Sequence, residues 1–357
     1  MLPRRILIFV LIMFLMVTVG QSFAAEADST ADERSDPVKV LMKRVQALEE
    51  ELDYYKKEQD ARQALMPTEK EEEKKERTED VLKASEEEAA QYVLLKQRTI
   101  EMRYSLTYQH SSYDKVTASI LDIERESYYD FTNSLSLSYG LLPRLSVSAN
   151  IPFIYKYQKS GDSMEESDLG DVSFGASWQL LKEAEYQPAL LVALGYSAPT
   201  GRSPYKIDIA QELSTGSGTN SFNLGVNLSK TLDPVIAFGG VSGTYALKVS
   251  GLNQKRYGAT LEEVIPGWGL SYSLGLGFAL SYTTSVTFRF SASHQARSKF
   301  TINGRQYEGD ESSSASFVIG TGWRISPKTS LNISLGYGLV GIEDYSLYFS
   351  VPFDFTI

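Results

Sequence analysis

The feature that most constrains this chain is a period-two alternation that recurs from residue 99 to the end of the sequence. Its clearest example is residues 133–153, where large apolar residues alternate with serine, glycine and asparagine on both sides of a turn at Leu142-Pro143-Arg144. Successive side chains of a strand point to opposite faces. The alternation with a turn between its halves therefore predicts a β-hairpin.

The polar phase of this alternation has an unusual composition. A water-facing sheet surface normally carries many Lys, Glu, Asp and Arg, because these residues are rarely buried. Here the polar phase is mostly Ser, Gly, Asn and Thr, opposite a phase of Leu, Val, Phe and Tyr. This composition is typical of a closed transmembrane barrel, whose apolar side faces lipid and whose small polar side lines the lumen.

The same alternation recurs in twelve segments. A transmembrane strand needs about 9 to 11 tilted residues, and each segment supplies that length. The segments are 99–110, 126–139, 144–157, 169–181, 187–198, 220–230, 234–247, 267–280, 283–296, 313–325, 329–340 and 345–357.

The connections between these segments alternate in length. Short ones such as Ser326–Lys328 follow every second segment, whereas those between include Ser111–Arg125 and Pro199–Thr219. Short periplasmic turns that alternate with long extracellular loops are typical of outer-membrane barrels. The sequence therefore predicts an all-β transmembrane barrel of about 12 antiparallel strands over residues 99–357, embedded in the lipid of the outer membrane of a Gram-negative-type cell.

The bulk composition excludes several other classes. The chain has 357 residues, a net charge of −10 and no cysteine. Without cysteine there is no disulfide framework and no thiolate chemistry. An acidic chain without clustered Lys and Arg is not expected to have a nucleic-acid partner.

Residues 1–24 resemble a secretory signal peptide. Arg4 and Arg5 precede the apolar run Ile6–Val19, and Ser22-Phe23-Ala24 offers small residues for cleavage. The alternative is an uncleaved anchor, but the run is short for a span of about 20 residues. We expect cleavage, followed by a flexible N-terminus over 25–36 in the periplasm.

Residues 37–63 carry the spacing of a coiled coil, with apolar residues alternately three and four apart. The alternative is an amphipathic helix that docks on its own domain. We expect homo-oligomerisation, and the seam does not decide between a dimer and a trimer. The seam residues are Val38, Leu41, Val45, Leu48, Leu52 and Tyr55.

Residues 64–80 are rich in Glu, Lys, Arg and Thr and predict a solvated linker. Residues 81–98 then become helix-prone and lead directly into the first strand. This helix is expected either to plug a polar lumen or to form a periplasmic stalk, and the sequence leaves both open. Its apolar residues are Leu82, Ala89, Val93, Leu94 and Leu95.

Charged residues also occur in the polar phase of the barrel segments. Because both signs occur, mutual ion pairing or contact with a plug is expected rather than a selective filter of one sign. The alternative is that several lie in the wet ends of the barrel. The residues expected to face the lumen are Glu101, Arg103, Asp130, Asp171, Arg289, Arg324 and Asp354.

The sequence predicts no catalytic residue, no metal site and no cofactor. Its two histidines, His110 and His294, lack the spacing of metal ligands. His110-Ser111-Ser112 fits the His-x-Ser spacing of outer-membrane phospholipase, but no third polar group is evident to orient the base. The acidic residues of segment 162–168 are expected to form a solvated loop rather than a cation site.

Three stretches resemble the barrels of the family called MetA pathway of phenol degradation. They are Ser197-Ala198-Pro199-Thr200-Gly201-Arg202-Ser203-Pro204-Tyr205, Ser214-Thr215-Gly216-Ser217-Gly218 and Leu228-Ser229-Lys230-Thr231-Leu232-Asp233-Pro234-Val235. The resemblance covers roughly residues 125–357. It implies an outer-membrane channel rather than an enzyme.

The order of segments resembles the outer-membrane channel of functional-amyloid (Fap) secretion systems. This resemblance implies a trimer formed by residues 38–55, a plug formed by residues 81–97, and export of an unfolded amyloid subunit. The alternative is uptake of small aromatic or hydrophobic compounds, and a third interpretation is a structural anchor. The last strand, ending at Ile357, resembles the strand that the barrel-assembly machinery recognises, although such strands usually end in an aromatic residue.

Overall fold

The computed structural model describes residues 94–117, 122–160, 162–208, 211–232, 235–256, 258–281, 283–326, 328–341 and 343–356. The expected signal peptide, flexible N-terminus, coiled coil and charged linker lie outside these residues. So does the expected helix 81–98 up to residue 93. These expectations stay predictions.

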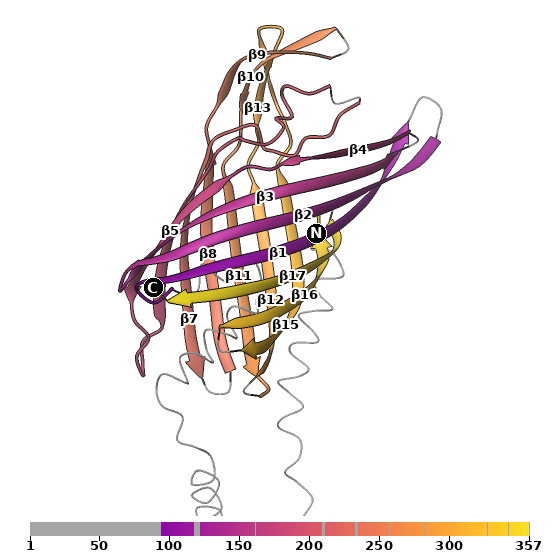
Figure 1. The fold of residues 1–357 in the computed structure, drawn as a ribbon. Helices are drawn as coiled ribbons and strands as arrows, with labels where there is room; N and C mark the ends of the chain where they lie inside the picture. The colour runs from indigo at the N-terminus through magenta and orange to yellow at the C-terminus, as the bar shows by residue number, and fades with distance from the viewer. Residues whose placement is uncertain are drawn as a thin grey trace, which may run out of the picture. The chain divides into compact units, whose positions relative to one another are not determined.

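The strands form a closed ring of antiparallel neighbours, because β17 pairs with β1 and β2 pairs with both β1 and β3 (Figure 1). The ring contains β1 (Thr99–Thr117), β2 (Asp122–Leu142), β3 (Leu145–Ser160), β4 (Asp162–Leu169), β5 (Ser173–Leu181), β6 (Ala189–Ser197), β7 (Ser221–Leu232), β8 (Val235–Ala246), β11 (Gly269–Ala279), β12 (Thr284–Gln295), β15 (Ser312–Ser326), β16 (Thr329–Val340) and β17 (Glu343–Thr356).

β4 and β5 follow one another along the same neighbour, β3, and together fill one position of the ring. The described residues therefore form a twelve-stranded barrel, which confirms the predicted fold class. Each of the twelve predicted segments overlaps one of these positions.

The two faces of the wall differ as the alternation predicts. On β2 the side chains of Leu135 and Leu137 are 48% and 51% exposed, whereas Ser134, the residue before Leu135, is 2% exposed. The same contrast holds on β16, where Leu335 is exposed and Ser334 is buried. In a transmembrane barrel the exposed apolar face meets lipid, so the serine-rich face lines the lumen.

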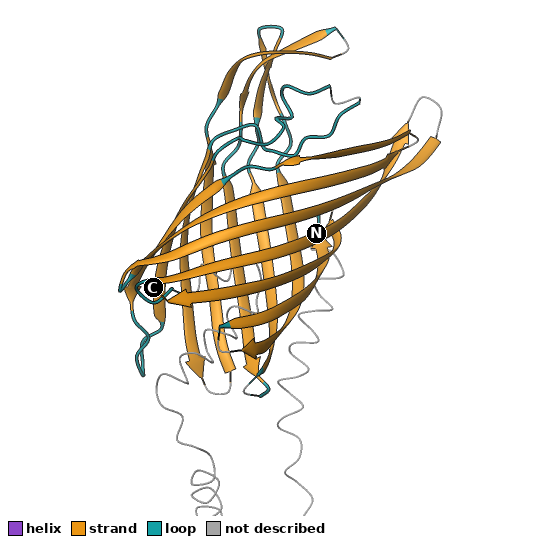
Figure 2. Ribbon diagram, in the orientation of Figure 1, coloured by secondary structure: helices purple, strands orange, loops and turns teal. Residues whose placement is uncertain are grey.

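The two ends of the barrel also differ. At one end the strands are joined by short turns such as 143–144 and 327–328. At the other end three connections are long, namely 198–220, 247–268 and 296–311, and the last two form a separate four-stranded sheet (Figure 2). Short turns mark the periplasmic end and long connections the extracellular end. This second sheet contains β9 (Val249–Arg256), β10 (Ala259–Ile265), β13 (Lys299–Ile302) and β14 (Arg305–Glu308).

Among the described residues, no helix has the length and apolarity to cross a membrane. The expected helix over 81–98 does not continue through its described part: residues 94–96 have no regular secondary structure and residues 97–98 form a turn. Arg98 has a left-handed backbone with φ of 63°, and its N–H donates to the Gly140 carbonyl at 2.9 Å. A left-handed residue bonded to a neighbouring strand cannot continue a helix.

Two segments that the sequence assigns to loops are strands. The acidic segment expected to be a solvated loop is β4, and its backbone pairs with β3 through Lys156 opposite Glu166. β1 and β2 likewise extend into the predicted loop 111–125. Backbone pairing with a neighbouring strand satisfies polar groups that a loop would leave to water. These charged strands therefore continue the wall on the extracellular side.

Candidate functional site

The inner face of the wall carries two rows of serines that run across neighbouring strands. In one row Ser242, Ser271, Ser293 and Ser314 lie opposite one another on β8, β11, β12 and β15. In the other row Gly240, Ser273, Ser291 and Ser316 lie opposite one another on the same four strands. This row is two residues nearer the periplasmic end of each strand. We call these two sets the serine rows. They form because every second residue of each strand is small and polar and the registers bring these residues into line.

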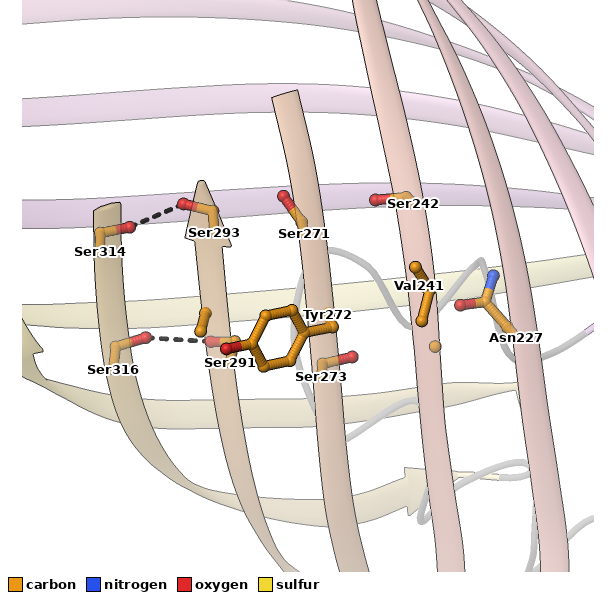
Figure 3. A pocket seen from close by; sticks show the side chains of 12 residues that line it. Asn227, Val241, Ser242, Ser271, Tyr272, Ser273, Ser291, Ser293, Ser314 and Ser316 are labelled. Atoms are coloured by element: carbon orange, nitrogen blue, oxygen red, sulfur yellow. Dashed lines mark hydrogen bonds between the residues drawn. The ribbon is translucent and has the colours of Figure 1, made fainter. Parts of the chain in front are cut away.

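The hydroxyl groups of the serine rows bond across the strands (Figure 3). Ser291 and Ser316 Oγ atoms are 3.0 Å apart, and Ser293 and Ser314 Oγ atoms are 2.7 Å apart. A hydroxyl carries one donor and two acceptor positions, so each retains hydrogen-bonding capacity toward the lumen. The rows line a cavity of about 190 Å³ together with Asn227.

Glycine positions on this face leave room for larger neighbours. A Cβ at position 240 would overlap the amide Oδ1 of Asn227, the residue opposite it on β7. A Cβ at position 275 would overlap the ring of Phe238, which lies opposite Gly275 on β8. The side chains of Asn227 and Phe238 are therefore held flat against the wall.

The lumen face also has an apolar sector, which the sequence analysis did not identify. It is formed by β6 and β8, and Phe238, Leu191 and Ile236 are 2%, 1% and 3% exposed. The signal was present in the sequence, since Ile236 and Phe238 share the phase of Gly240 and Ser242. A large apolar residue in the small polar phase of a barrel strand marks an apolar part of the lumen.

Two of the predicted lumen charges form a buried ion pair. Arg103 Nη2 lies 2.7 Å from Glu101 Oε1, and these side chains are 6% and 4% exposed. Asp354 on β17 is opposite Glu101 in register. Arg289 on β12 is opposite Gly275, and it is 6% exposed. Opposite charges this close largely cancel, so the Glu101–Arg103 pair gives the wall no strong sign.

Three other predicted charges lie elsewhere in the wall. Asp130 is opposite Lys156 in register, with Oδ2 3.7 Å from Nζ, on the extracellular side. Arg324 lies near the periplasmic end of β15, where its N–H donates to the carbonyl of Thr283 at 2.8 Å. Asp171 lies in the break between β4 and β5. The predicted charges are thus spread along the barrel rather than gathered at one level.

Asp171 anchors the connection 198–220 that follows β6. Its Oδ2 accepts hydrogen bonds from the N–H and the hydroxyl of Ser217 at 2.7 and 2.6 Å. Its Oδ1 accepts from the N–H of Gly201 at 3.1 Å. A carboxylate that accepts several backbone and hydroxyl donors makes charge-assisted bonds, which are stronger than neutral ones.

Two threonines of the same connection complete the hydrogen bonding of the break. Thr200 Oγ1 donates to the Gly170 carbonyl at 2.8 Å and accepts from the Val172 N–H at 2.9 Å. Thr215 Oγ1 donates to the Leu169 carbonyl at 2.8 Å and accepts from the Arg202 N–H at 3.0 Å. These side chains supply the hydrogen bonds that a paired strand would otherwise make to the backbone of the break. The first two stretches that resemble the phenol-degradation family, 197–205 and 214–218, thus hold this connection against the wall.

The candidate hydrolytic residues do not form a catalytic arrangement. Asp344 on β17 lies near His110 and Ser112. Its Oδ2 accepts a hydrogen bond from Ser112 Oγ at 2.6 Å and lies 3.2 Å from His110 Nδ1. A nucleophilic serine has to donate to the base rather than to the carboxylate. Ser112 and His110 instead share one carboxylate oxygen. Within the described residues, no cluster of three His, Asp or Glu side chains suits a metal ion.

Comparison with solved structures supports the barrel architecture. An outer membrane channel from Pseudomonas putida F1 matches with a TM-score of 0.56 and 16% identity over 74% of this chain and 97% of that chain. The translocator domain of the autotransporter NalP from Neisseria meningitidis matches at 0.46, with 10% identity over 72% and 88%. The CymD monoaromatic hydrocarbon channel matches at 0.40, with 11% identity over 73% and 89%. The first likeness shows the fold, and the other two carry no inference.

A closed barrel with an apolar outer face is an outer-membrane protein of a Gram-negative-type cell. The sequence profile of one family matches residues 114–346, which is more than half of the chain. The chain belongs to the family described as "Putative MetA-pathway of phenol degradation".

Proposed function

We propose that the protein is an outer-membrane channel for the uptake of small aromatic or hydrophobic compounds. The observation that carries this proposal is the chemistry of the lumen face between β6 and β15. There uncharged serine hydroxyls line a cavity of about 190 Å³, and the apolar side chains of Phe238 and Leu191 pack in the wall on neighbouring strands. A solute with a hydroxyl group finds hydrogen-bonding partners in the serine rows, and no charged side chain is among the described residues that line the cavity.

The size of the lumen cavity agrees with a small solute. The cavity beside the serine rows is about 190 Å³, and a cavity of about 150 Å³ holds one benzene molecule in another protein. One substituted ring therefore fits in this cavity. The description of the family also points to aromatic compounds.

We infer that the lumen charges stabilise the wall rather than select ions. Glu101 and Arg103 neutralise one another at 2.7 Å, and the predicted lumen charges include both signs. An ion-selective channel needs a ring of one sign at a constriction. Passage of neutral solutes requires no such ring.

Export of an unfolded amyloid subunit, the function first expected from the order of segments, has no support from the described residues. The coiled coil that carried it lies outside them, and so does most of the helix. The trimer, the amyloid partner and the barrel-assembly machinery stay predictions.

Uptake is tested by deleting the gene and measuring consumption of phenol at a low external concentration, where entry limits the rate. The wild-type gene is expected to restore consumption, and so is the variant Phe290→Trp, because Phe290 lies on the outer face of β12. The variant Ser291→Trp is expected to restore it poorly, since position 291 lies in a serine row on the inner face.

Equal folded amounts of both variants in the outer membrane are the necessary control. Equal consumption by the two variants, or unchanged consumption after deletion, contradicts the proposal. Loss of extracellular fibrils in the deletion strain with unchanged consumption would instead support export.

A further inference from the structure

An apolar groove lies on the outer face of the barrel, at the extracellular ends of five neighbouring positions of the ring. Its volume is about 740 Å³. It crosses β5, β6, β7, β8 and β11, which are consecutive in the sheet. The outward side chains that line it include Phe174, Leu194, Phe222, Tyr245, Trp268 and Leu270.

The floor of the groove exists because one outward position is a glycine. Gly243 on β8 is opposite Leu224 on β7 and Leu270 on β11, so a side chain at 243 would stand in the middle of the row. A Cβ built at this position meets nothing closer than the Gly269 carbonyl oxygen at 4.0 Å. The wall is therefore hollowed between two leucines.

The extracellular rim of the groove is aromatic and ordered. Tyr196 and Phe222 have ring centroids 5.3 Å apart, and Tyr196 donates its hydroxyl proton to Asn220 Oδ1 at 2.7 Å. Aromatic residues of this amphipathic kind stand at the membrane interface of outer-membrane barrels. The groove therefore begins at the interface and runs into the outer leaflet.

We propose that this groove is a binding site for one acyl chain of an outer-leaflet lipid. The groove is continuous with the lipid-facing surface, so lipid chains are the molecules that reach it. Its walls are almost wholly apolar, so a hydrocarbon chain loses no hydrogen bond there. Its hollow shape lets a chain contact side chains on two sides.

The reporter for this site is Trp268, which lines the groove and is 53% exposed. Trp178 is a matched control, since it is 55% exposed on the same face and does not line the groove. The chain has three tryptophans. Trp178→Phe with Trp323→Phe leaves Trp268 as the only tryptophan, and Trp268→Phe with Trp323→Phe leaves Trp178.

The experiment titrates phosphatidylglycerol with brominated acyl chains into each single-tryptophan protein in detergent micelles and measures quenching of fluorescence. The site predicts a saturable phase of quenching for Trp268 at low lipid, which Trp178 lacks. Equal quenching of both tryptophans in direct proportion to added lipid overturns the proposal.

A second comparison fills the groove. Gly243→Leu in the Trp268-only protein is expected to abolish the saturable phase. Ala315→Leu, which places a leucine side chain on the outer face of β15 away from the groove, is expected to retain it. Retention of the saturable phase by folded Gly243→Leu protein overturns the assignment of the floor. If that variant does not fold, the comparison of the two tryptophans still decides the proposal.

Discussion

Phe238 and Gly275 face one another across β8 and β11, and the ring of Phe238 fills the space where a side chain at 275 would stand. Phe238 is 2% exposed on the lumen face. The inner surface at this level is thus formed by one large side chain that lies over a position without one. The pair couples the two strands, since a side chain at 275 meets the ring of Phe238.

Gly275→Ala is predicted to destabilise the barrel, because the added methyl group meets the ring of Phe238. Overpacking of this kind costs about 1–3 kcal/mol. In a Phe238→Ala background the cost is expected to fall, although not to zero, because the carbonyl oxygen of Phe288 is 2.9 Å from the new Cβ. Urea unfolding in detergent micelles measures the free energy of each variant in the double-mutant cycle.

The matched control for this cycle is Gly225→Ala on β7. Its Cβ meets Ser242 Cβ at 3.5 Å, an ordinary contact, so a small effect is expected. If Gly275→Ala costs no more than Gly225→Ala, the ring of Phe238 does not occupy the position described.

Glu101→Ala is predicted to lower the free energy of unfolding by about 3 kcal/mol, since removal of one partner leaves a buried charge without its counterion. The partner Arg103 lies at 2.7 Å and is almost fully buried. The double variant Glu101→Ala/Arg103→Ala is expected to cost less than the sum of the two single variants. Equilibrium unfolding in urea gives these values.

Glu308→Ala serves as the control for the buried pair. Glu308 lies 4.0 Å from Arg297, and both side chains are more than half exposed, so a loss below about 1 kcal/mol is expected. Equal losses of unfolding free energy in Glu101→Ala and Glu308→Ala would show that burial does not strengthen the Glu101–Arg103 pair.

The alternation along the strands predicted the ring, its strand number and its two faces, because a barrel repeats one local rule at every position. The same rule does not give the pairing of residues that are distant in sequence. Asp344 lies beside His110 and Ser112 only because β17 closes the ring on β1. That closing register follows from the shear of the whole barrel and not from any one segment.

Asp171 shows the second limit of the sequence. It was predicted as a lumen charge because of its phase, yet its carboxylate holds the connection 198–220 in the break between β4 and β5. The period-two alternation predicts the direction of a side chain only while the strand continues. At a break, the residue contacts whatever loop returns to fill the gap, and that contact depends on residues such as Ser217, 46 positions away.

Asp171→Asn is predicted to loosen the connection 198–220 without unfolding the barrel. The amide loses the charge that strengthens three hydrogen bonds and brings an NH₂ group toward donors. A loss of about 1–3 kcal/mol is expected, which corresponds to faster amide exchange by about one to two powers of ten. Hydrogen exchange of the amides of Gly201 and Ser217 measures the effect.

Asp168→Asn is the control for this substitution, because the Asp168 carboxylate accepts from the N–H of the adjacent Leu169 on exposed β4. Exchange at Gly201 and Ser217 is expected to stay unchanged in that variant. Similar exchange in both variants would remove Asp171 from its anchoring role.

The most direct measurement of the proposed solute path uses the absence of cysteine from the chain. Single cysteines at Ser273, in a serine row, and at Leu274, 68% exposed on the outer face, probe the two sides of β11. In native outer membranes, a small water-soluble thiol reagent is expected to modify Ser273→Cys, more slowly when phenol is in excess, and to leave Leu274→Cys unmodified. Modification of Leu274→Cys but not Ser273→Cys, or a rate at position 273 that phenol does not change, would contradict the account.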